Sequence, residues 1–337
     1  MYPFKVNNPT TVNAAAQALA GGKAAIIAGG TEQLFFLKAM HSPATPPETL
    51  VNLKSIPGLT DIKEEGNTLK IGALATLTAI ANNDIIKSKY TALAQAAKAV
   101  ASPELRNQGT IGGNICQRVQ CWYYKADNNL FPCRRKVSNG PCYALLGDNR
   151  YNSIFGQVNT CYAVNPSDTA PALLALGAKI VTNKKTYNAS EFWSATNTSD
   201  IEKTTVLALD EIVTEIQIPA PAAGTKSAFK KFALRKSFDF PIVNAAAVIT
   251  LSGGTVSKAS IALNAVHNLP RKATAAEDSI NGKAINADTA WDAGVAALNG
   301  ANAMPQTPAN TTWDTIGNKY MIQIAKVLVK RAILDCR

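Results

Sequence analysis

Four cysteines within one segment are the residues of this chain best suited to hold a metal. Gaps of 11, 8 and 18 residues separate them, and glycine, proline and basic residues are frequent between them. This spacing differs from the closely paired cysteines of most structural zinc sites, although tetrahedral zinc remains an alternative. An iron–sulfur cluster accepts thiolates from irregular loops, and four cysteines usually hold a [4Fe–4S] cluster. Unligated thiols or disulfides are the third alternative for this set, which consists of Cys121, Cys133, Cys142 and Cys161.

Aromatic and basic residues accompany these cysteines. The triplet Trp122-Tyr123-Tyr124 follows the first cysteine, and Arg134-Arg135-Lys136 follows the second. Aromatic rings exclude water and cations offset the negative charge of bound thiolates, so both triplets fit a metal centre whose potential they would influence. The competing interpretation is that the rings belong to the core and that the basic triplet is a solvated loop.

A glycine turn near the amino terminus suggests a second kind of site. The apolar run 24–28 predicts a buried strand, which leads into Gly29-Gly30-Thr31 and then into the apolar residues 34–37 of an expected helix. Glycines leave backbone N–H groups open to a pyrophosphate, and a hydroxyl adds a hydrogen bond. Alone the signal is weak, because such a turn is often structural and the chain lacks the G-x-G-x-x-G pattern there.

A second turn of this kind strengthens the interpretation. Residues 109–114 read Gly-Thr-Ile-Gly-Gly-Asn, about 80 residues after the first turn. Two such turns are able to clamp one dinucleotide from both sides. A nucleotide cofactor beside a metal centre indicates electron transfer.

Composition limits the class of protein. A length of 337 residues suggests two domains, and 47% apolar with 17% charged residues indicates an ordered globular chain. We expect no membrane span, because no stretch approaches the roughly 18 apolar residues that one requires. The net charge of +11 is dispersed and accompanies no nucleic-acid-binding motif, so we expect no nucleic-acid partner and favour an acidic protein partner. Without a visible signal peptide, we expect a cytoplasmic protein, or a periplasmic one if a signal-bearing partner exports it.

The periodicity predicts where the second domain begins. Strands are expected at 227–234, 244–252 and 256–265, and the glycine pair 253–254 predicts a hairpin between the last two. Apolar residues at helical spacing predict a final helix near 321–332. We therefore expect a first domain at 1–224, with a cysteine-rich insert at about 115–162, and a second domain at 225–337.

Four motifs, in their order along the chain, resemble the FAD-binding medium subunit of the xanthine dehydrogenase family of molybdenum hydroxylases. The resemblance covers nearly the whole chain. The motifs are Ile27-Ala28-Gly29-Gly30-Thr31-Glu32-Gln33-Leu34, the turn from Gln108 to Asn114, Asn165-Pro166-Ser167-Asp168, and the turn from His267 to Arg271.

The cysteine segment resembles one branch of this family. Most such subunits lack these cysteines, whereas the flavin subunits of bacterial periplasmic aldehyde oxidoreductase and of 4-hydroxybenzoyl-CoA reductase carry an extra [4Fe–4S] cluster there. The segment is most similar to the aldehyde oxidoreductase version, because Gln117-Arg118 precedes Cys121 and because Cys161 lies four residues before Asn165. The resemblance implies that Cys121, Cys133, Cys142 and Cys161 ligate the cluster. It gives no agreed role to Cys116.

For the fold, the resemblance implies an α+β architecture. A two-lobed vanillyl-alcohol-oxidase (PCMH)-type FAD-binding domain would precede a smaller domain of sheet plus helices, similar to the carbon monoxide dehydrogenase flavoprotein C-terminal domain. By motif position, the implied cofactor-binding residues are Ile27, Ala28, Gly29, Gly30, Thr31, Glu32, Gln33, Leu34, Thr110, Gly113, Asn114, Asp168, Arg235 and Lys236. Glu32-Gln33 stands where Asp or Asn followed by Leu is commoner, which makes a contact from Glu32 less expected.

The implied activity is divided among subunits. A molybdenum-cofactor large subunit oxidises the substrate with water as the oxygen source, a [2Fe–2S] small subunit relays electrons, and this chain passes them through FAD to an external acceptor. No catalytic residue is expected here, because the cofactor does the chemistry. The alternatives are a stand-alone FAD oxidase or reductase on the same fold, a hydroxybenzoyl-CoA-reductase-like subunit with reversed electron flow, and a basic zinc-bearing interaction module.

Overall fold

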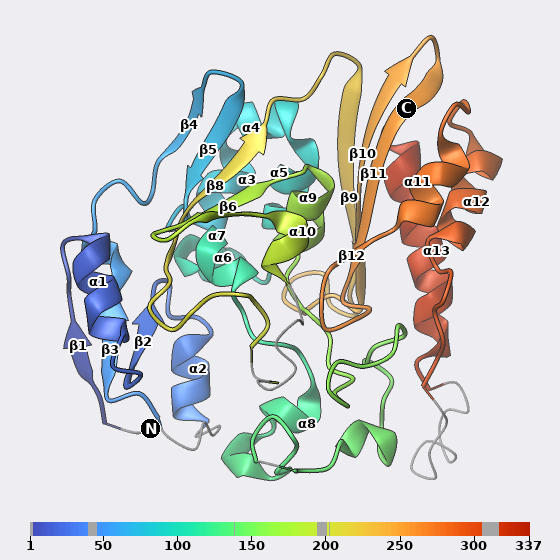
Figure 1. Cartoon of the computed structure of the whole chain (residues 1–337). Coiled ribbons are helices and arrows are strands. Elements are labelled where there is room, and N and C mark those ends of the chain that lie inside the picture. The colour runs from blue at the N-terminus through green and yellow to red at the C-terminus, as the bar shows by residue number, and fades with distance from the viewer. Residues whose placement is uncertain (1–2, 40–45, 138, 194–200, 202, 305–316) are drawn as a thin grey trace.

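Over the residues that it describes, the computed structural model contains three sheets, each with its own helices (Figure 1). It describes residues 3–39, 46–137, 139–193, 201, 203–304 and 317–337. The first two sheets form two lobes of one unit, and the third sheet with the last helices forms the other. This two-domain α+β architecture confirms the fold class expected from the resemblance.

The amino-terminal lobe is a small parallel sheet in the order β1-β3-β2. Thr11 begins its first helix, because its hydroxyl accepts a hydrogen bond from the N–H of Ala14. The second helix starts directly after the glycine turn that follows β2. The elements are β1 (Lys5–Asn7), α1 (Val12–Leu19), β2 (Ala24–Ile27), α2 (Gln33–Lys38), β3 (Thr49–Asn52) and η1 (Leu53–Ser55).

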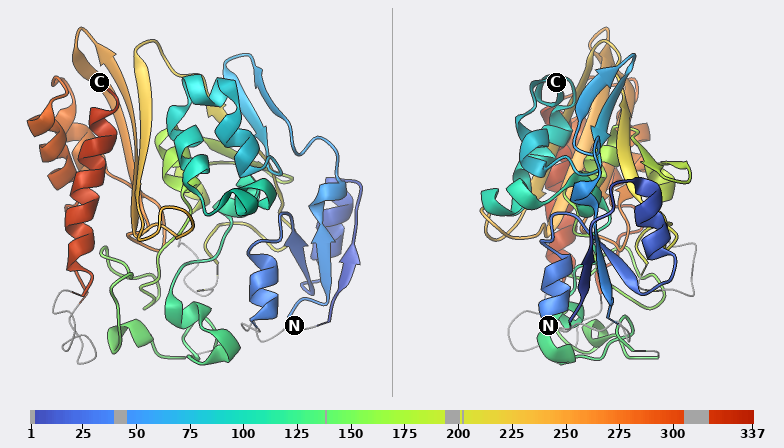
Figure 2. Two further views of the ribbon diagram at one scale, coloured as in Figure 1. Left: turned by 180° about the vertical axis from the view of Figure 1, so that it is seen from behind. Right: turned by 90° about the vertical axis from the view of Figure 1, so that its left-hand side faces the viewer.

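The central lobe is an antiparallel sheet in the order β4-β5-β8-β6-β7. Helices from residues 77–108 cover one face of this sheet, which the left view of Figure 2 turns toward the reader. The sheet contains β4 (Ile62–Glu65), β5 (Thr68–Gly72), β6 (Lys179–Thr182), β7 (Thr186–Asn188) and β8 (Val213–Pro219). The helices are α3 (Leu77–Asn82), α4 (Asp84–Lys89), α5 (Thr91–Ala99), α6 (Pro103–Gln108), α7 (Ile111–Ile115), α9 (Thr169–Ala175) and α10 (Ala189–Phe192).

The carboxy-terminal unit is an antiparallel sheet in the order β12-β11-β10-β9. One face of the sheet packs against helices of the central lobe, α5 and α9, and the other against the last three helices of the chain. Gly253 and Gly254 take positive φ angles of 57° and 82° in the β10–β11 hairpin, a conformation that favours glycine. The elements are β9 (Thr225–Phe232), β10 (Val243–Ser252), β11 (Thr255–Asn264), β12 (Arg271–Lys272), α11 (Thr274–Ile280), α12 (Ala287–Ala296) and α13 (Lys319–Leu334).

The cysteine-rich insert lies at one end of the molecule, below the other units in Figures 1 and 2. It has little regular structure, namely α8 (Trp122–Lys125), η2 (Asp127–Asn129) and η3 (Tyr143–Leu145). Two isolated antiparallel bridges, Gln120 with Val164 and Val158 with Cys161, join segments of the insert that are not β-strands. The insert is therefore a loop structure held at its two ends.

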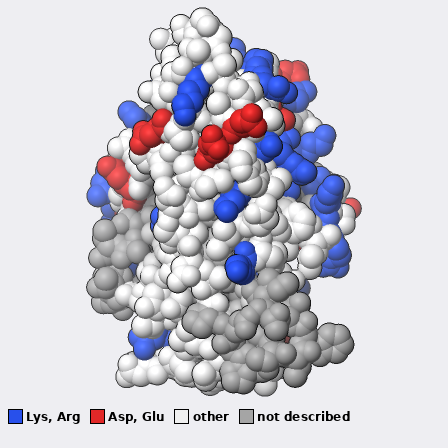
Figure 3. Space-filling model, turned by 90° about the vertical axis from the view of Figure 1, so that its right-hand side faces the viewer, with Lys and Arg blue, Asp and Glu red and all other residues white. Residues whose placement is uncertain are grey.

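The charged residues are unevenly distributed over the surface. On the face formed by the carboxy-terminal helices, Lys and Arg gather along one edge, and Asp and Glu form only small groups (Figure 3). None of the helices in the described part of the chain combines the length and apolar character of a membrane span.

Candidate functional site: two glycine turns and a cysteine pocket

The two glycine turns meet in space. A Cβ on Gly29 would lie 2.0 Å from the carbonyl oxygen of Gln108, so the backbone of the second turn occupies the place of that side chain. Gly30 has a φ of +75°, in the left-handed region that favours glycine. The glycines of the first turn are thus required by the close approach of the second turn and by the backbone conformation.

The first turn leaves its backbone donors open. Among the described residues, no atom accepts a hydrogen bond from the N–H groups of Gly29, Gly30 or Thr31. The Thr31 side chain is exposed, and the turn leads into the amino terminus of α2. Open N–H groups at the start of a helix suit the negative charge of a phosphate.

The second turn, in contrast, uses its donors within the protein. The N–H of Ile111 bonds to the carbonyl of Ala75, that of Gly112 to Ala73, and that of Gly113 to the Thr110 hydroxyl, at 2.9 to 3.1 Å. The second turn is therefore an anchored support whose backbone donors at 111–113 are already satisfied. Gly113 itself is exposed, and a Cβ there would meet only the Thr110 oxygen within 4 Å, at 3.1 Å.

Asn114 is oriented by the third motif. Its Oδ1 accepts hydrogen bonds from the hydroxyls of Ser167 and Thr169, both at 2.6 Å. No described residue accepts from its Nδ2, so the amide group remains a donor. The motif at 165–168 thus fixes which side of the Asn114 amide is available.

Asp168 has a structural partner in the second domain. Its two carboxylate oxygens accept from the Nζ of Lys231 at 2.7 Å and from the Nδ2 of Asn244 at 2.8 Å. Asp168 is 3% exposed, and burial raises its pKa while Lys231 acts in the opposite direction. Lys231 and Asn244 therefore occupy both carboxylate oxygens and join the start of α9 to β9 and β10. A contact of Asp168 with the ribityl or adenosine part of FAD stays a prediction. Its side chain makes no N-cap bond to α9, and Ser167 instead accepts from the N–H of Ala170.

Arg235 and Lys236 lie in the exposed loop between β9 and β10. The Arg235 guanidinium forms an ion pair with Asp239 at 2.6 Å, and both basic residues are exposed. From the same loop, the ring centre of Phe240 lies 4.6 Å from the Nζ of Lys125 in α8. The loop therefore contacts the cysteine-rich insert, and the placement of Arg235 and Lys236 near a flavin stays a prediction.

Glu32 joins the first turn to the insert, a connection that our sequence-based expectations did not include. Both of its carboxylate oxygens accept from the N–H of Arg118 at 3.1 Å, and the Nζ of Lys125 lies 3.9 Å away. Burial raises the pKa of Glu32, and the charges of Lys125 and Arg118 oppose that shift. The unusual Glu at this motif position was the only sequence signal for this connection.

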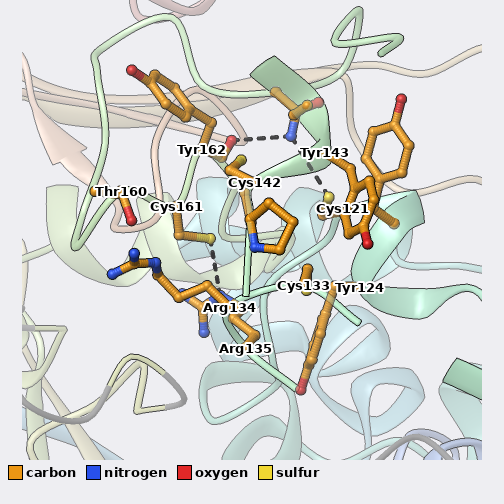
Figure 4. Close-up of a pocket in the computed structure, with 15 residues that line it drawn as sticks. Cys121, Tyr124, Cys133, Arg134, Arg135, Cys142, Tyr143, Thr160, Cys161 and Tyr162 are labelled. Atoms are coloured by element: carbon orange, nitrogen blue, oxygen red, sulfur yellow. Dashed lines mark hydrogen bonds between the residues drawn. The ribbon is translucent and has the colours of Figure 1, made fainter. Parts of the chain in front are cut away.

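The four cysteines of the insert line one pocket (Figure 4). All six cysteines of the chain are free thiols, which excludes the disulfide alternative in this structure. The described residues contain no group of three or more His, Cys, Asp or Glu side chains already arranged to hold a metal ion. The cavity between the lining residues has a volume of about 20 Å³, and the non-atom space is about 350 Å³ when the opening to solvent is included. Ligation would require the four sulfur atoms to turn toward a common centre.

The charges around this pocket favour an anionic occupant. Burial raises the pKa of Cys121 to about 11 and also raises the pKa of Cys133 and Cys142. Arg135 and Lys136 are 4% and 5% exposed, and neither forms an ion pair with a described carboxylate. These two side chains of the basic triplet are therefore buried and do not belong to a solvated loop. Because a buried unpaired cation is costly, the pocket suits a group that carries negative charge, such as metal-bound thiolates.

Aromatic side chains connect the pocket to the first glycine turn. Tyr124 lines the pocket, and its ring centre lies 5.7 Å from that of Phe36 in α2. The same two residues pack with Cys133 and Cys161 in one apolar cluster. The pocket and the turn are therefore joined by α2, which begins at the turn and ends beside the insert.

Comparisons with known proteins agree with this arrangement. Residues 2–221 match the family described as the FAD binding domain in molybdopterin dehydrogenase, and residues 227–336 match the carbon monoxide dehydrogenase flavoprotein C-terminal domain. The aldehyde oxidoreductase FAD-binding subunit PaoB of Escherichia coli is 28% identical over 340 residues, which cover 99% of this chain and 97% of that subunit. The carbon monoxide dehydrogenase medium chain of Hydrogenophaga pseudoflava is also 28% identical, over 98% of this chain and 96% of the relative.

A solved structure of the Hydrogenophaga pseudoflava carbon monoxide dehydrogenase has the same fold. It superimposes with a TM-score of 0.72 at 27% identity, covering 99% of this chain and 98% of that one. The chain belongs to the FAD-binding medium subunits of the xanthine dehydrogenase and molybdenum hydroxylase family. It is accordingly a flavoprotein subunit of an oxidoreductase.

Proposed function

We propose that this chain is an electron-transfer subunit that carries FAD at the paired glycine turns and a [4Fe–4S] cluster in the cysteine pocket. The observation that carries the proposal is the junction of the two sites through Glu32 and Phe36, on the segment that follows the first turn. Electrons would pass between the sites across this junction. FAD supplies the redox chemistry at the turns, and the chain supplies binding and position.

The residues at the turns fit the pyrophosphate of FAD. The open N–H groups of Gly29, Gly30 and Thr31 would bind phosphate oxygens, and the Thr31 hydroxyl adds a donor. The Asn114 amide, whose oxygen is held by Ser167 and Thr169, would donate to the cofactor from a fixed orientation. Apart from Asn114, the second turn contributes mainly the exposed backbone of Gly113, because its backbone donors at 111–113 are already bonded within the protein.

Gly113 offers a selective test of this site. A Cβ there meets only the Thr110 hydroxyl oxygen, at 3.1 Å, so a side chain at this exposed position should leave most of the fold intact, and the methyl groups of a valine would occupy the space proposed for the cofactor. We expect Gly113→Val to bind FAD at least about tenfold more weakly, a loss of about 1.4 kcal/mol, as measured by flavin fluorescence during reconstitution. The control is Gly254→Val in the distant hairpin, where no atom lies within 4 Å, although its positive φ will reduce stability. Full flavin occupancy in Gly113→Val contradicts the proposed site.

The cysteine pocket fits a [4Fe–4S] cluster better than a single zinc ion. The four thiols line one pocket, and the buried guanidinium of Arg135, which has no carboxylate partner among the described residues, faces the charge that bound thiolates would carry. Cys116 does not line this pocket, and burial raises its pKa to about 12. We therefore assign Cys121, Cys133, Cys142 and Cys161 as ligands and leave Cys116 outside the set.

Two cysteine variants distinguish ligands from bystanders. Cys133→Ser should lose most of its iron and its visible iron–sulfur absorbance, because an open iron position destabilises the cluster. Cys116→Ser should keep about four iron atoms per chain, the number in the proposed cluster. Iron and acid-labile sulfide are measured on protein purified without oxygen. Equal iron in Cys133→Ser and wild type contradicts the ligand assignment, and zinc without iron in the wild type favours the interaction module instead.

The chain is proposed to act with partners. Its relatives are described as a FAD-binding subunit and a medium chain, terms for components of larger enzymes. We propose that a molybdenum-cofactor large subunit and a [2Fe–2S] small subunit bind this chain and supply its electrons, which leave to an external acceptor. The positive surface in Figure 3 supports an acidic partner surface, because complementary charge speeds association.

A further inference from the structure

Arg135 is placed against the sulfur of a proposed cluster ligand. Its Nε donates to the Sγ of Cys161 at 3.1 Å, and the residue is 4% exposed. A tight turn holds it there, because the N–H groups of Lys136 and Val137 both bond to the carbonyl of Cys133. The guanidinium carbon lies 6.0 Å from the ring centre of Tyr124, on the wall of the same pocket (Figure 4).

The charge of Arg135 has no other evident counterpart. No carboxylate in the described part of the chain pairs with it, although a buried guanidinium without an anion is costly. A guanidinium does not lose its proton in proteins, so the cation persists in the pocket at any working pH. The nearest acceptor is the sulfur of Cys161, and an N–H bond to an ionised sulfur is stronger than one to a neutral thiol.

We propose, on the basis of the [4Fe–4S] site above, that Arg135 raises the reduction potential of that cluster through its charge and its N–H bond to Cys161. Reduction adds one electron to the cluster and no proton to Arg135, so the added negative charge is stabilised by a fixed cation and donor. Asn152 is a second and weaker donor, with its Nδ2 at 3.7 Å from the sulfur of Cys121. Arg135 thus acts through the ligand thiolate and is a positioning residue rather than a catalytic one.

Two substitutions separate the hydrogen bond from the charge. In Arg135→Gln the amide nitrogen takes the position of the arginine Nε, so the donor is kept and the charge is lost. In Arg135→Met both are lost and the chain length of the side chain is nearly kept. The matched control is Arg134→Met, which removes the same charge from the same pocket lining but has no hydrogen bond to a cysteine sulfur among the described residues.

The measurement is a redox titration of the cluster in the purified full-length chain, followed by electron paramagnetic resonance. We expect Arg135→Met to change the reduced-to-oxidised ratio at a fixed potential at least tenfold toward the oxidised form, a shift of about 59 mV to lower potential. Arg135→Gln should lie between Arg135→Met and the wild type. Arg134→Met should shift by less than half as much as Arg135→Met.

The outcomes distinguish this inference from the proposed function. Iron-free wild-type protein overturns both the cluster and the role of Arg135. An intact cluster whose potential shifts equally in Arg135→Met and Arg134→Met overturns the role of Arg135 alone. If Arg135→Met loses its iron, Arg135→Gln is compared with Arg134→Gln: a lower potential in Arg135→Gln supports the inference, and equal potentials overturn it.

Discussion

At the scale of single residues, burial determines the chemistry of several side chains. Burial raises the pKa of three thiols of the pocket, Cys121, Cys133 and Cys142, and that of the Asp168 carboxyl, because it disfavours the charged form. Nearby cations oppose this shift at two of these groups, namely Lys136 and Arg135 at Cys133 and Lys231 at Asp168. His267 differs, because the nearest charge is the like charge of Arg271.

His267 should make the stability of the protein depend on pH. Burial, assisted by Arg271, lowers its pKa from 6.5 to about 4 in the folded protein. The unfolded chain therefore takes up a proton first, and stability falls as the pH drops from about 6.5 to about 4. The full effect is roughly 3 kcal/mol, from 1.36 kcal/mol per unit of pKa.

The measurement is urea unfolding between pH 4 and pH 7 in wild type and in His267→Asn. The asparagine keeps an acceptor where Nδ1 of His267 accepts from the N–H of Leu269, but it does not titrate. Carboxylates titrate in both proteins, so the difference between the two curves isolates His267. Parallel curves would show that the folded pKa of His267 is close to its usual value.

At the scale of elements, the site depends on segments that are far apart in the sequence. The second glycine turn reaches the first because β5 leads to Ala73 and Ala75, whose carbonyls accept from the turn at 111–112. The third motif reaches Asn114 of α7 from the start of α9. Asp168 then continues this connection to Lys231 on β9 in the second domain.

The pair of Asp168 and Lys231 should stabilise the contact between the domains. Removing either charge alone leaves the other buried, so Asp168→Asn or Lys231→Met should reduce the free energy of unfolding by about 3–5 kcal/mol. The double variant should lose less than the sum, because it leaves no unpaired charge. Chemical denaturation of all four proteins measures this coupling, and strictly additive losses would contradict it.

The elements that the sequence predicts correctly are those with strong local patterns. The strand before Gly29, the hairpin at Gly253-Gly254 and the final helix are confirmed, because apolar runs, turn glycines and helical spacing act locally. The sequence pattern did not indicate α12, nor did it indicate β6 and β7, which are short strands completed by distant pairing. The contact between the glycine turns, the pair of Asp168 with Lys231 and the burial of Arg135 depend on tertiary packing, so the linear pattern did not show them.

At the scale of the whole molecule, the cysteine pocket lies at one end of a chain that carries a large net positive charge. The net charge is +11, and Lys and Arg gather along one edge of the face in Figure 3. Exposed charges act over about 8–10 Å at moderate ionic strength, so salt should slow partner association more than it weakens buried contacts. A chain with this charge and these sites is suited to work within an assembly.

Gel filtration of the protein from its own cells, with mass identification and metal analysis of the peak, tests the central claim most directly. We predict elution with two further chains, in a fraction that contains molybdenum, FAD and iron, with aldehyde oxidation confined to that fraction. A lone chain that binds FAD and oxidises aldehydes without molybdenum would contradict the account and leave a stand-alone flavoenzyme in its place.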